Sequence, residues 1–215
     1  MAITELIFLP INANEQVRAD FDDKAPALIR ATFNVVGGPT TTAVGRVLES
    51  TPTNAENHCG YVAVFCWESL DMIKDFIKTP GFANFRASLV GYLDGPPTLQ
   101  FFATLPDIAP EQTLQDSTHF FFTKSTGTVA QISHVKQQWD EITTTFSRIA
   151  KDEVKYHNGD GVQDYDGYFA GFSGWKSITA LEKALGQAEI RKQLEALTKV
   201  SESISSFTLE LNHVF

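Results

Sequence analysis

The pattern of apolar and polar positions predicts a regular order of elements in the first half of the chain. Short β-branched, aromatic or alternating runs predict four strands, at residues 6–9, 42–49, 61–67 and 98–103. Apolar residues at nearly helical spacing predict three helices, at residues 15–32, 69–77 and 82–89. Pro26 is expected to kink or split the first helix, and Thr79-Pro80-Gly81 separates the other two.

The second half repeats this order. We expect strands at residues 118–123, 153–157, 168–172 and 207–214, and helices at residues 129–149 and 177–197. Six apolar residues place one continuous stripe on the first of these helices: Val129, Ile132, Val135, Trp139, Ile142 and Phe146. Each half therefore reads strand, helix, strand, strand, helix, strand.

A constant offset shows that the two halves are copies of one unit. Trp67 and Trp175 stand 108 residues apart. Seven further apolar pairs keep that offset: Leu70 and Ile178, Ile73 and Leu181, Ile77 and Leu185, Phe82 and Ile190, Leu89 and Leu197, Phe101 and Leu209, and Ala103 and Leu211. Tyr61 and Tyr168 are only 107 apart, which predicts one extra residue, a bulge, around Ser173-Gly174.

These observations predict an α+β fold of two modules. Residues 1–106 form the first unit and residues 114–215 the second, and residues 107–113 have the proline and acidic content of a linker. A βαββαβ unit is a ferredoxin-like module, whose antiparallel sheet has helices on one face only. The bare faces of the two sheets are expected to pack together as a pseudo-dimeric α/β barrel.

The Trp-x-Ser start of the second helix in each unit, the proline break after it and the closing strand resemble the dimeric α/β-barrel superfamily. That superfamily includes the antibiotic-biosynthesis-monooxygenase-like and stress-responsive barrel families. The resemblance implies the fold, and it implies activities such as cofactor-independent oxygenation, polyketide cyclisation, haem degradation or chlorite dismutation. Residues 65–103 are also similar to a plant polyketide cyclase of this fold. Phe76 and Phe82 stand at the positions of its catalytic tyrosine and histidine, so that mechanism is not carried over.

Composition and charge narrow the class of protein. The 215 residues are 43% hydrophobic and include 17 Phe, which supports a folded core and excludes disorder. A net charge of −9 disfavours nucleic acid as a partner. The chain has no apolar run of roughly 20 residues and no secretory leader pattern, so we expect a cytoplasmic protein that does not bind membranes.

The sequence predicts no cofactor. It contains no nucleotide-binding glycine loop and no pair of histidines with helical metal spacing. His58 and Cys59 form a single adjacent pair, and two cysteines cannot build a disulfide framework or a multi-cysteine zinc site. Haem stays a minor possibility, because no haem motif of the superfamily can be mapped onto the chain.

Alternation along the expected strands provides the candidate catalytic residues. His119 and Phe121 share one side of their strand, and Phe120 and Phe122 share the other. If the purely aromatic side packs on helices, His119 faces the barrel interior, where it could act as acid or base. The alternative is a hydrogen-bonded structural histidine.

In the last strand, Thr208, Glu210 and Asn212 form the polar side, opposite an apolar side. Glu210 is the candidate general base if that side faces inward, because burial raises the pKa of a carboxyl group. The alternative is a solvated barrel edge. We therefore predict one site per chain, bordered by the first and last strands of the second unit. Its candidate substrate-binding residues are Asn212, Phe121, Tyr168, Phe102, His157 and Glu49, the last two also being candidates for solvated strand ends.

Two functions fit this sequence. The first is a small-molecule enzyme of specialised metabolism, of cofactor-independent oxygenase or cyclase type, acting on an apolar aromatic or polyketide-like substrate. The second is a non-catalytic barrel that is stress-associated or binds a lipophile. A Phe-lined cavity containing His119 or Glu210 would favour the enzyme, and a filled barrel would favour the binding protein. Either would work as a monomeric pseudo-dimer or as a homodimer.

Overall fold

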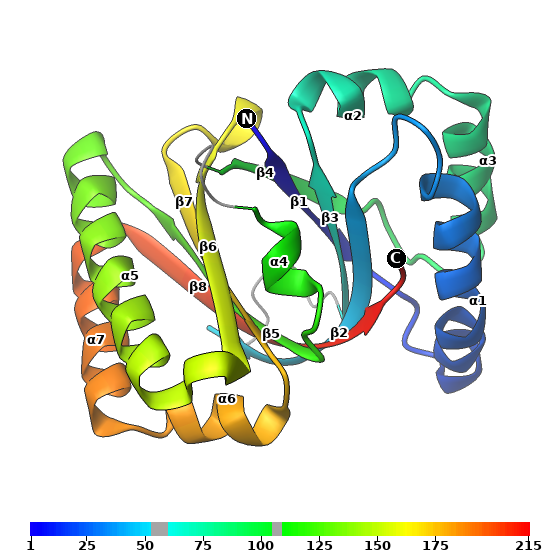
Figure 1. Cartoon of the computed structure of the whole chain (residues 1–215). Helices are drawn as coiled ribbons and strands as arrows, with labels where there is room; N and C mark the ends of the chain where they lie inside the picture. The colour runs from blue at the N-terminus through cyan, green and yellow to red at the C-terminus, as the bar shows by residue number, and fades with distance from the viewer. Residues whose placement is uncertain (53–59, 105–108) are drawn as a thin grey trace.

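The computed structural model describes residues 1–52, 60–104 and 109–215 and shows a closed antiparallel barrel (Figure 1). Its eight strands are β1 (Ile3–Leu9), β2 (Thr41–Thr51), β3 (Tyr61–Trp67), β4 (Thr98–Ala103), β5 (His119–Thr126), β6 (Val154–Gly161), β7 (Tyr168–Trp175) and β8 (Ser203–His213). Around the barrel the order is β1-β3-β2-β8-β5-β7-β6-β4, so each unit contributes four neighbouring strands. The α+β fold class and the two-module barrel predicted from sequence are confirmed.

The helices lie outside the barrel, apart from one short helix between the units (Figure 1). α1 (Glu15–Phe33), α2 (Leu70–Phe76) and α3 (Pro80–Leu89) belong to the first unit, and α5 (Val129–Ala150), α6 (Ile178–Leu185) and α7 (Ala188–Val200) to the second. The short elements are α4 (Glu111–Leu114) and the 3₁₀ turns Lys151–Glu153 and Gln163–Tyr165. In the described part of the chain, no helix is both long and apolar enough to cross a membrane. The predicted domain boundaries and oligomeric state remain predictions.

Local side chains explain where the helices begin and end. The hydroxyls of Ser69 and Ser177 accept hydrogen bonds from the first turns of α2 and α6, as the Trp-x-Ser pattern predicts. α1 runs through Pro26 as a single helix, so the expected split is wrong. The single helix predicted over residues 177–197 is two helices, because the chain breaks at Gly186 and Gln187.

The bulge predicted in the second unit is also wrong. β7 pairs with β5 and β6 in unbroken register, from Tyr168 to Trp175 and from Phe169 to Trp175 respectively. The offset is therefore 108 along the whole strand, which makes Tyr61 equivalent to Phe169 and not to Tyr168. The register irregularity instead lies in β2, between Val47 and Glu49, where β2 pairs with β8 at the seam between the units.

The barrel interior is filled by apolar side chains from both sheets. Phe8 of the first unit lies 5.3 Å from the Phe207 ring and 6.3 Å from the Phe122 ring of the second. The buried cluster consists of Leu6, Phe8, Ala43, Val62, Val64, Cys66, Phe102, Leu114, Phe120, Phe122, Ala170, Phe172, Phe207, Leu209 and Leu211. Burial raises the pKa of the Cys66 thiol, so this cysteine stays a neutral part of the core.

The linker inserts into this interior through α4, which Figure 1 shows between the two halves. Leu114 is fully buried in the interior cluster. Gly174 of β7 makes the close approach possible, because a Cβ there would lie 1.8 Å from the carbonyl oxygen of Thr113. The predicted linker is thus partly a structural element that covers one end of the barrel.

Candidate functional site

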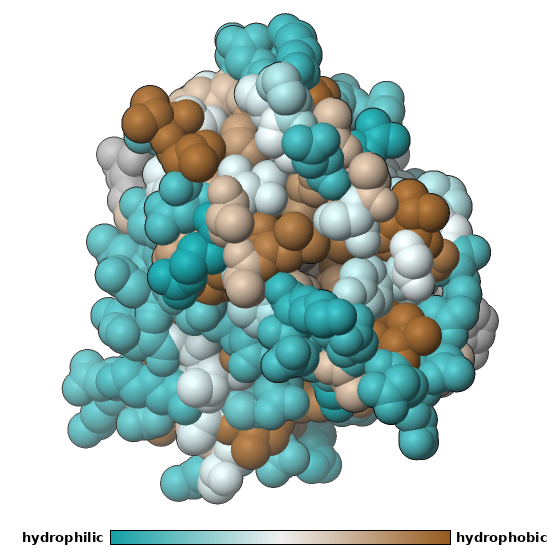
Figure 2. All heavy atoms as spheres, turned by 90° about the vertical axis from the view of Figure 1, so that its right-hand side faces the viewer, coloured by the Kyte–Doolittle hydropathy of each residue, from teal (hydrophilic) through white to brown (hydrophobic). Residues whose placement is uncertain are grey.

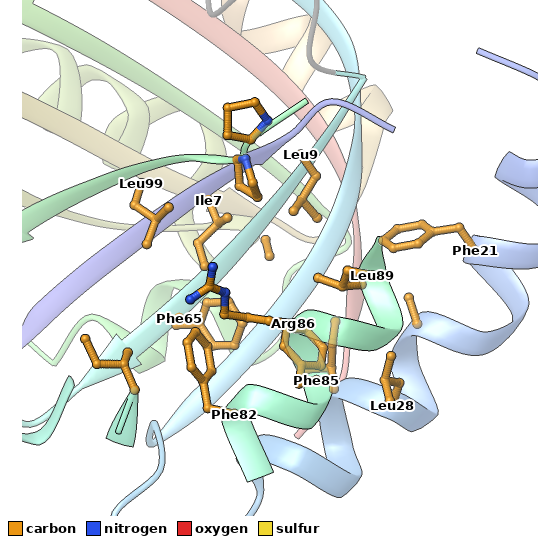
Figure 3. Close-up of a pocket in the computed structure, with 16 residues that line it drawn as sticks. Ile7, Leu9, Phe21, Leu28, Phe65, Phe82, Phe85, Arg86, Leu89 and Leu99 are labelled. Carbon is orange, nitrogen blue, oxygen red and sulfur yellow. The ribbon is translucent and has the colours of Figure 1, made fainter. Parts of the chain in front are cut away.

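An apolar cavity of about 410 Å³ lies in the first unit, between the outer face of the sheet and the helices (Figure 3). One wall comes from β1, β3 and β4, with Ile7, Phe65 and Leu99 among its residues. The opposite wall comes from α1 and α3, with Phe85 and Leu89 among its residues. Figure 2 looks onto this side of the molecule, where apolar side chains gather around a hollow. A space of this size and lining suits a small, largely apolar ligand.

At the strand position equivalent to Ala63, the second unit is filled by the indole of Trp139. Ala63 lines the cavity in the first unit, and the 108-residue offset makes Gly171 its equivalent. A Cβ on Gly171 would lie only 2.3 Å from the indole of Trp139, which is fully buried on α5. Trp139 therefore fills, beside Gly171 in the second unit, the space that is part of the cavity beside Ala63 in the first unit.

Arg86 of α3 is the charged residue in the wall of the cavity. Figure 3 shows its guanidinium turned toward the sheet, beside Ile7 and Phe65. Among the described residues, Arg86 has no ion-pair or hydrogen-bond partner. Arg86 is exposed to solvent, and its guanidinium presents several N–H donors that can bind an anionic or electron-rich oxygen of a ligand in the cavity.

A buried carboxyl group lies next to this cavity. Glu5 of β1 is 4% exposed and faces the helices, two residues from Ile7 on the same side of the strand. Its Oε2 accepts a 2.8 Å hydrogen bond from the Trp67 indole N–H. Burial raises the pKa of Glu5 to about 7, and the hydrogen bond from Trp67 partly opposes that rise.

Sequence reasoning missed Glu5. The signal was present, because an acidic residue interrupts the apolar run Ile3–Leu9 at a position whose neighbours on the same face are all apolar. Among the residues that the structure describes, no group of three His, Cys, Asp or Glu side chains is placed to hold a metal ion. His58 and Cys59 lie outside the described residues.

His119 and Glu210 are brought together, but on the outside of the barrel. They are cross-strand partners in the β5–β8 pair, and the Nδ1 of His119 lies 2.9 Å from the hydroxyl of Thr118. The predicted inward orientation is wrong: Phe120 and Phe122 fill the interior, while His119 is half-buried on the other face and Glu210 is exposed. The aromatic side faces inward, where Phe122 stacks 4.7 Å from the Phe207 ring and Phe120 stacks 5.8 Å from the Phe172 ring.

Of the remaining outward-facing candidates, Phe121 and Glu49 line one outer groove and Asn212 does not. Asn212 is exposed on β8, two residues beyond Glu210. Phe121 is buried against the helices of the second unit, and it also borders an open outer groove that includes Glu49. This groove, of about 420 Å³, lies against β5 and β8, but neither His119 nor Glu210 lines it. The single site bordered by the first and last strands of the second unit stays a prediction.

The other three candidates lie in or against the barrel interior. His157 is buried there, stacked 4.5 Å from the Phe172 ring, so the solvated strand end considered for it is wrong. Its Nε2 lies 3.0 Å from the Thr4 hydroxyl and its Nδ1 2.8 Å from the Thr113 hydroxyl, which ties α4 to the barrel. Burial lowers the pKa of His157 to about 3. Phe102 is fully buried in the same cluster, and Tyr168 packs against it.

Comparison with known proteins identifies the fold. No protein-family model and no curated protein sequence matches the chain. A candidate monooxygenase from Lactobacillus acidophilus NCFM superposes with a TM-score of 0.63 at 12% identity, over 100% of this chain and 94% of that chain. A candidate monooxygenase from Fusobacterium nucleatum superposes with a TM-score of 0.65 at 9% identity, over 99% of this chain and 93% of that chain. An anthrone oxidase-like protein superposes with a TM-score of 0.61 at 13% identity, over 99% of this chain and 91% of that chain.

These similarities extend over both units, so each of the three structures shares the whole barrel and not one module alone. The chain is an α/β-barrel protein built from two fused ferredoxin-like modules. Its fold, a closed eight-stranded barrel with helices outside, is the one that the repeat predicted and that these three structures share.

Proposed function

We propose that the chain is a small-molecule enzyme of oxygenase type, which binds an apolar, ring-containing substrate in the cavity of the first unit and uses neither nucleotide nor metal. The observation that carries this proposal is the cavity itself: about 410 Å³ of apolar space with one guanidinium, that of Arg86, in its wall. Aromatic rings fit such walls, and an electron-rich oxygen on the ring fits the guanidinium.

The chemistry that suits this arrangement is oxidation of an activated methylene group. In an anthrone, the CH₂ between two rings loses a proton because the negative charge moves to the carbonyl oxygen, where Arg86 would stabilise it. The carbanion then reduces O₂, a C–O bond forms, and loss of water leaves a new carbonyl. The balance is CH₂ + O₂ → C=O + H₂O. The similarity to an anthrone oxidase-like structure supports the choice of this substrate class.

A second function is favoured by a different observation. The barrel interior is filled, and Phe76 and Phe82 remain in place of the tyrosine and histidine of the related cyclase design. A non-catalytic lipophile-binding protein would need only the cavity and Arg86. Binding of the probe without any consumption of O₂ would support this function over the enzyme.

The test uses anthrone as the probe, with binding followed by ligand fluorescence and turnover by an oxygen electrode. We expect saturable binding and one O₂ consumed for each anthrone. Ala63→Phe places a ring in the cavity, as Trp139 does in the second unit, and should weaken binding at least 10-fold, since roughly 1.4 kcal/mol is tenfold. Ala83→Phe, on the exposed side of α3, is the matched control and should bind as the wild type does. Equal binding by both variants would contradict the proposed location.

A further inference from the structure

We propose that Glu5 is the catalytic base of the cavity in the first unit, and that Trp67 is the positioning residue that holds its carboxylate. This inference rests on the proposed function and names the group that removes the substrate proton. It starts from a cavity whose own wall contains a cation, Arg86, but no proton acceptor.

The strand register places Glu5 at the edge of that cavity. Glu5 lies opposite Phe65 of β3 and opposite Phe101 of β4. Phe65 and the next residue on the same face of β1, Ile7, both line the cavity. Figure 3 shows the Arg86 guanidinium beside these two residues. A substrate carbonyl at Arg86 would therefore place the ring beside Phe65, the residue that lies opposite Glu5, with the CH₂ group on the far side of that ring from the carbonyl.

Glu5 could be present only to accept the hydrogen bond of Trp67, and the second unit tests this structural explanation. The equivalent tryptophan, Trp175, also donates its indole N–H, but to the hydroxyl of Ser173 at 2.9 Å. The residue equivalent to Glu5 there is Phe121, because it pairs with Ser173 as Glu5 pairs with Phe65. A neutral hydroxyl is thus enough for this tryptophan, and burying a carboxyl group for the same purpose would cost free energy. A role in proton transfer explains why the first unit has a carboxyl group at this position.

The surroundings of Glu5 leave one oxygen for the substrate. Trp67 occupies Oε2, and among the described residues no other group is hydrogen-bonded or ion-paired with Glu5. Trp67 is itself held by ring contacts with Phe76 at 5.3 Å and Phe65 at 6.4 Å. The charged groups of α2 point elsewhere: Lys74 pairs with Asp71 at 3.0 Å, and Asp75 pairs with Lys78 at 2.9 Å, all at the surface. Arg86 is then the cation that shares the cavity side with Glu5.

The proposed step is a proton transfer. The substrate C–H bond breaks, an O–H bond forms on the free oxygen of Glu5, and the electron pair moves to the carbonyl oxygen at Arg86. Protonated Glu5 then returns its proton to the oxygen that leaves as water, in the O₂ reaction given above. A carboxyl group with a pKa of about 7 can both accept and return a proton near neutral pH.

The test separates proton abstraction from oxygenation by excluding O₂. Exchange of the anthrone CH₂ hydrogens for deuterium in D₂O is followed by NMR, with binding measured in the same samples. We expect wild-type protein to accelerate exchange, with a rate that rises through pH 7. Glu5→Gln still accepts the Trp67 hydrogen bond but no proton, and should lower the exchange rate by roughly 10²–10⁴-fold with little change in binding. Glu68→Gln, an exposed neighbour, is the matched control.

Trp67→Phe supplies the second readout. Losing the hydrogen bond removes the one contact that lowers the pKa of Glu5, so the rise in exchange rate should move to higher pH. Exchange by Glu5→Gln at the wild-type rate, or wild-type protein that binds anthrone without accelerating exchange, would overturn the role of Glu5. Exchange that depends on Glu5 without any O₂ consumption would support the base and overturn the oxygenase. Wild-type protein that does not bind anthrone would overturn both.

Discussion

Replacing Glu5 by Gln should stabilise the protein, and by an amount that depends on pH. The pKa of Glu5 rises from 4.5 to about 7 on folding, because burial penalises the charged form. Below pH 4.5 the carboxyl group is neutral in both states and costs the native protein nothing further. As the pH rises from 4.5 through 7, the unfolded chain loses this proton first, so the stability of the wild-type protein falls relative to that of Glu5→Gln.

The magnitude follows from the same two values. A shift of about 2.5 pH units at ~1.4 kcal/mol each gives an advantage of roughly 3.5 kcal/mol for the variant above pH 8. The amide keeps an acceptor for the Trp67 indole N–H, so the fold loses no hydrogen bond. Urea unfolding of both proteins at about pH 4, 5.5, 7 and 8.5 measures the difference, because these values span the two pKa values of Glu5, in the unfolded and in the folded protein. We expect it to grow from near zero to its full value across this range.

Glu68→Gln is the control for this series, because Glu68 is exposed and should show no such trend. The titration of buried His157 is common to all three proteins and cancels in the comparison. A difference between Glu5→Gln and wild type that does not change with pH, or a variant that is the less stable protein at pH 8.5, would refute the assigned burial of a titrating carboxyl group.

Two further predictions concern the second unit and the linker. Trp139→Ala should open in the second unit the space that is empty in the first, and should lower the free energy of unfolding by about 3–5 kcal/mol in urea titrations; a cost below ~1 kcal/mol would contradict its filling role. His157 has a pKa lowered from 6.5 to about 3, so the unfolded chain binds its proton first as the pH falls, and stability should be lost from pH 6.5 downward. His157→Leu should unfold with less acid sensitivity, as judged by circular dichroism at pH 7 and pH 5, although it loses the Thr4 and Thr113 hydrogen bonds.

The order of elements and the internal repeat could be predicted from the sequence because their signals are local. Helical and strand periodicities, the serine caps after Trp67 and Trp175, and the proline at Pro80 act over a few residues, and the structure has elements at nearly the same bounds. The two-module barrel could also be predicted from the repeat, because a sheet with helices on only one face needs a second sheet to cover its other face. α4 was missed because four residues carry no periodic signal, and its place depends on the distant Gly174.

The direction of each strand face was decided by tertiary structure alone. Alternation separates His119 from Phe120, but the same pattern results whether the aromatic side meets helices or the opposite sheet. The location of the cavity is likewise non-local, because it depends on Trp139 of a helix meeting Gly171 of a strand, a contact without an equivalent at Ala63. Glu5 appears in the sequence only as an acidic residue in an apolar strand. Its burial, its raised pKa and its place beside the cavity arise because β3, β4 and the helices remove water from around it.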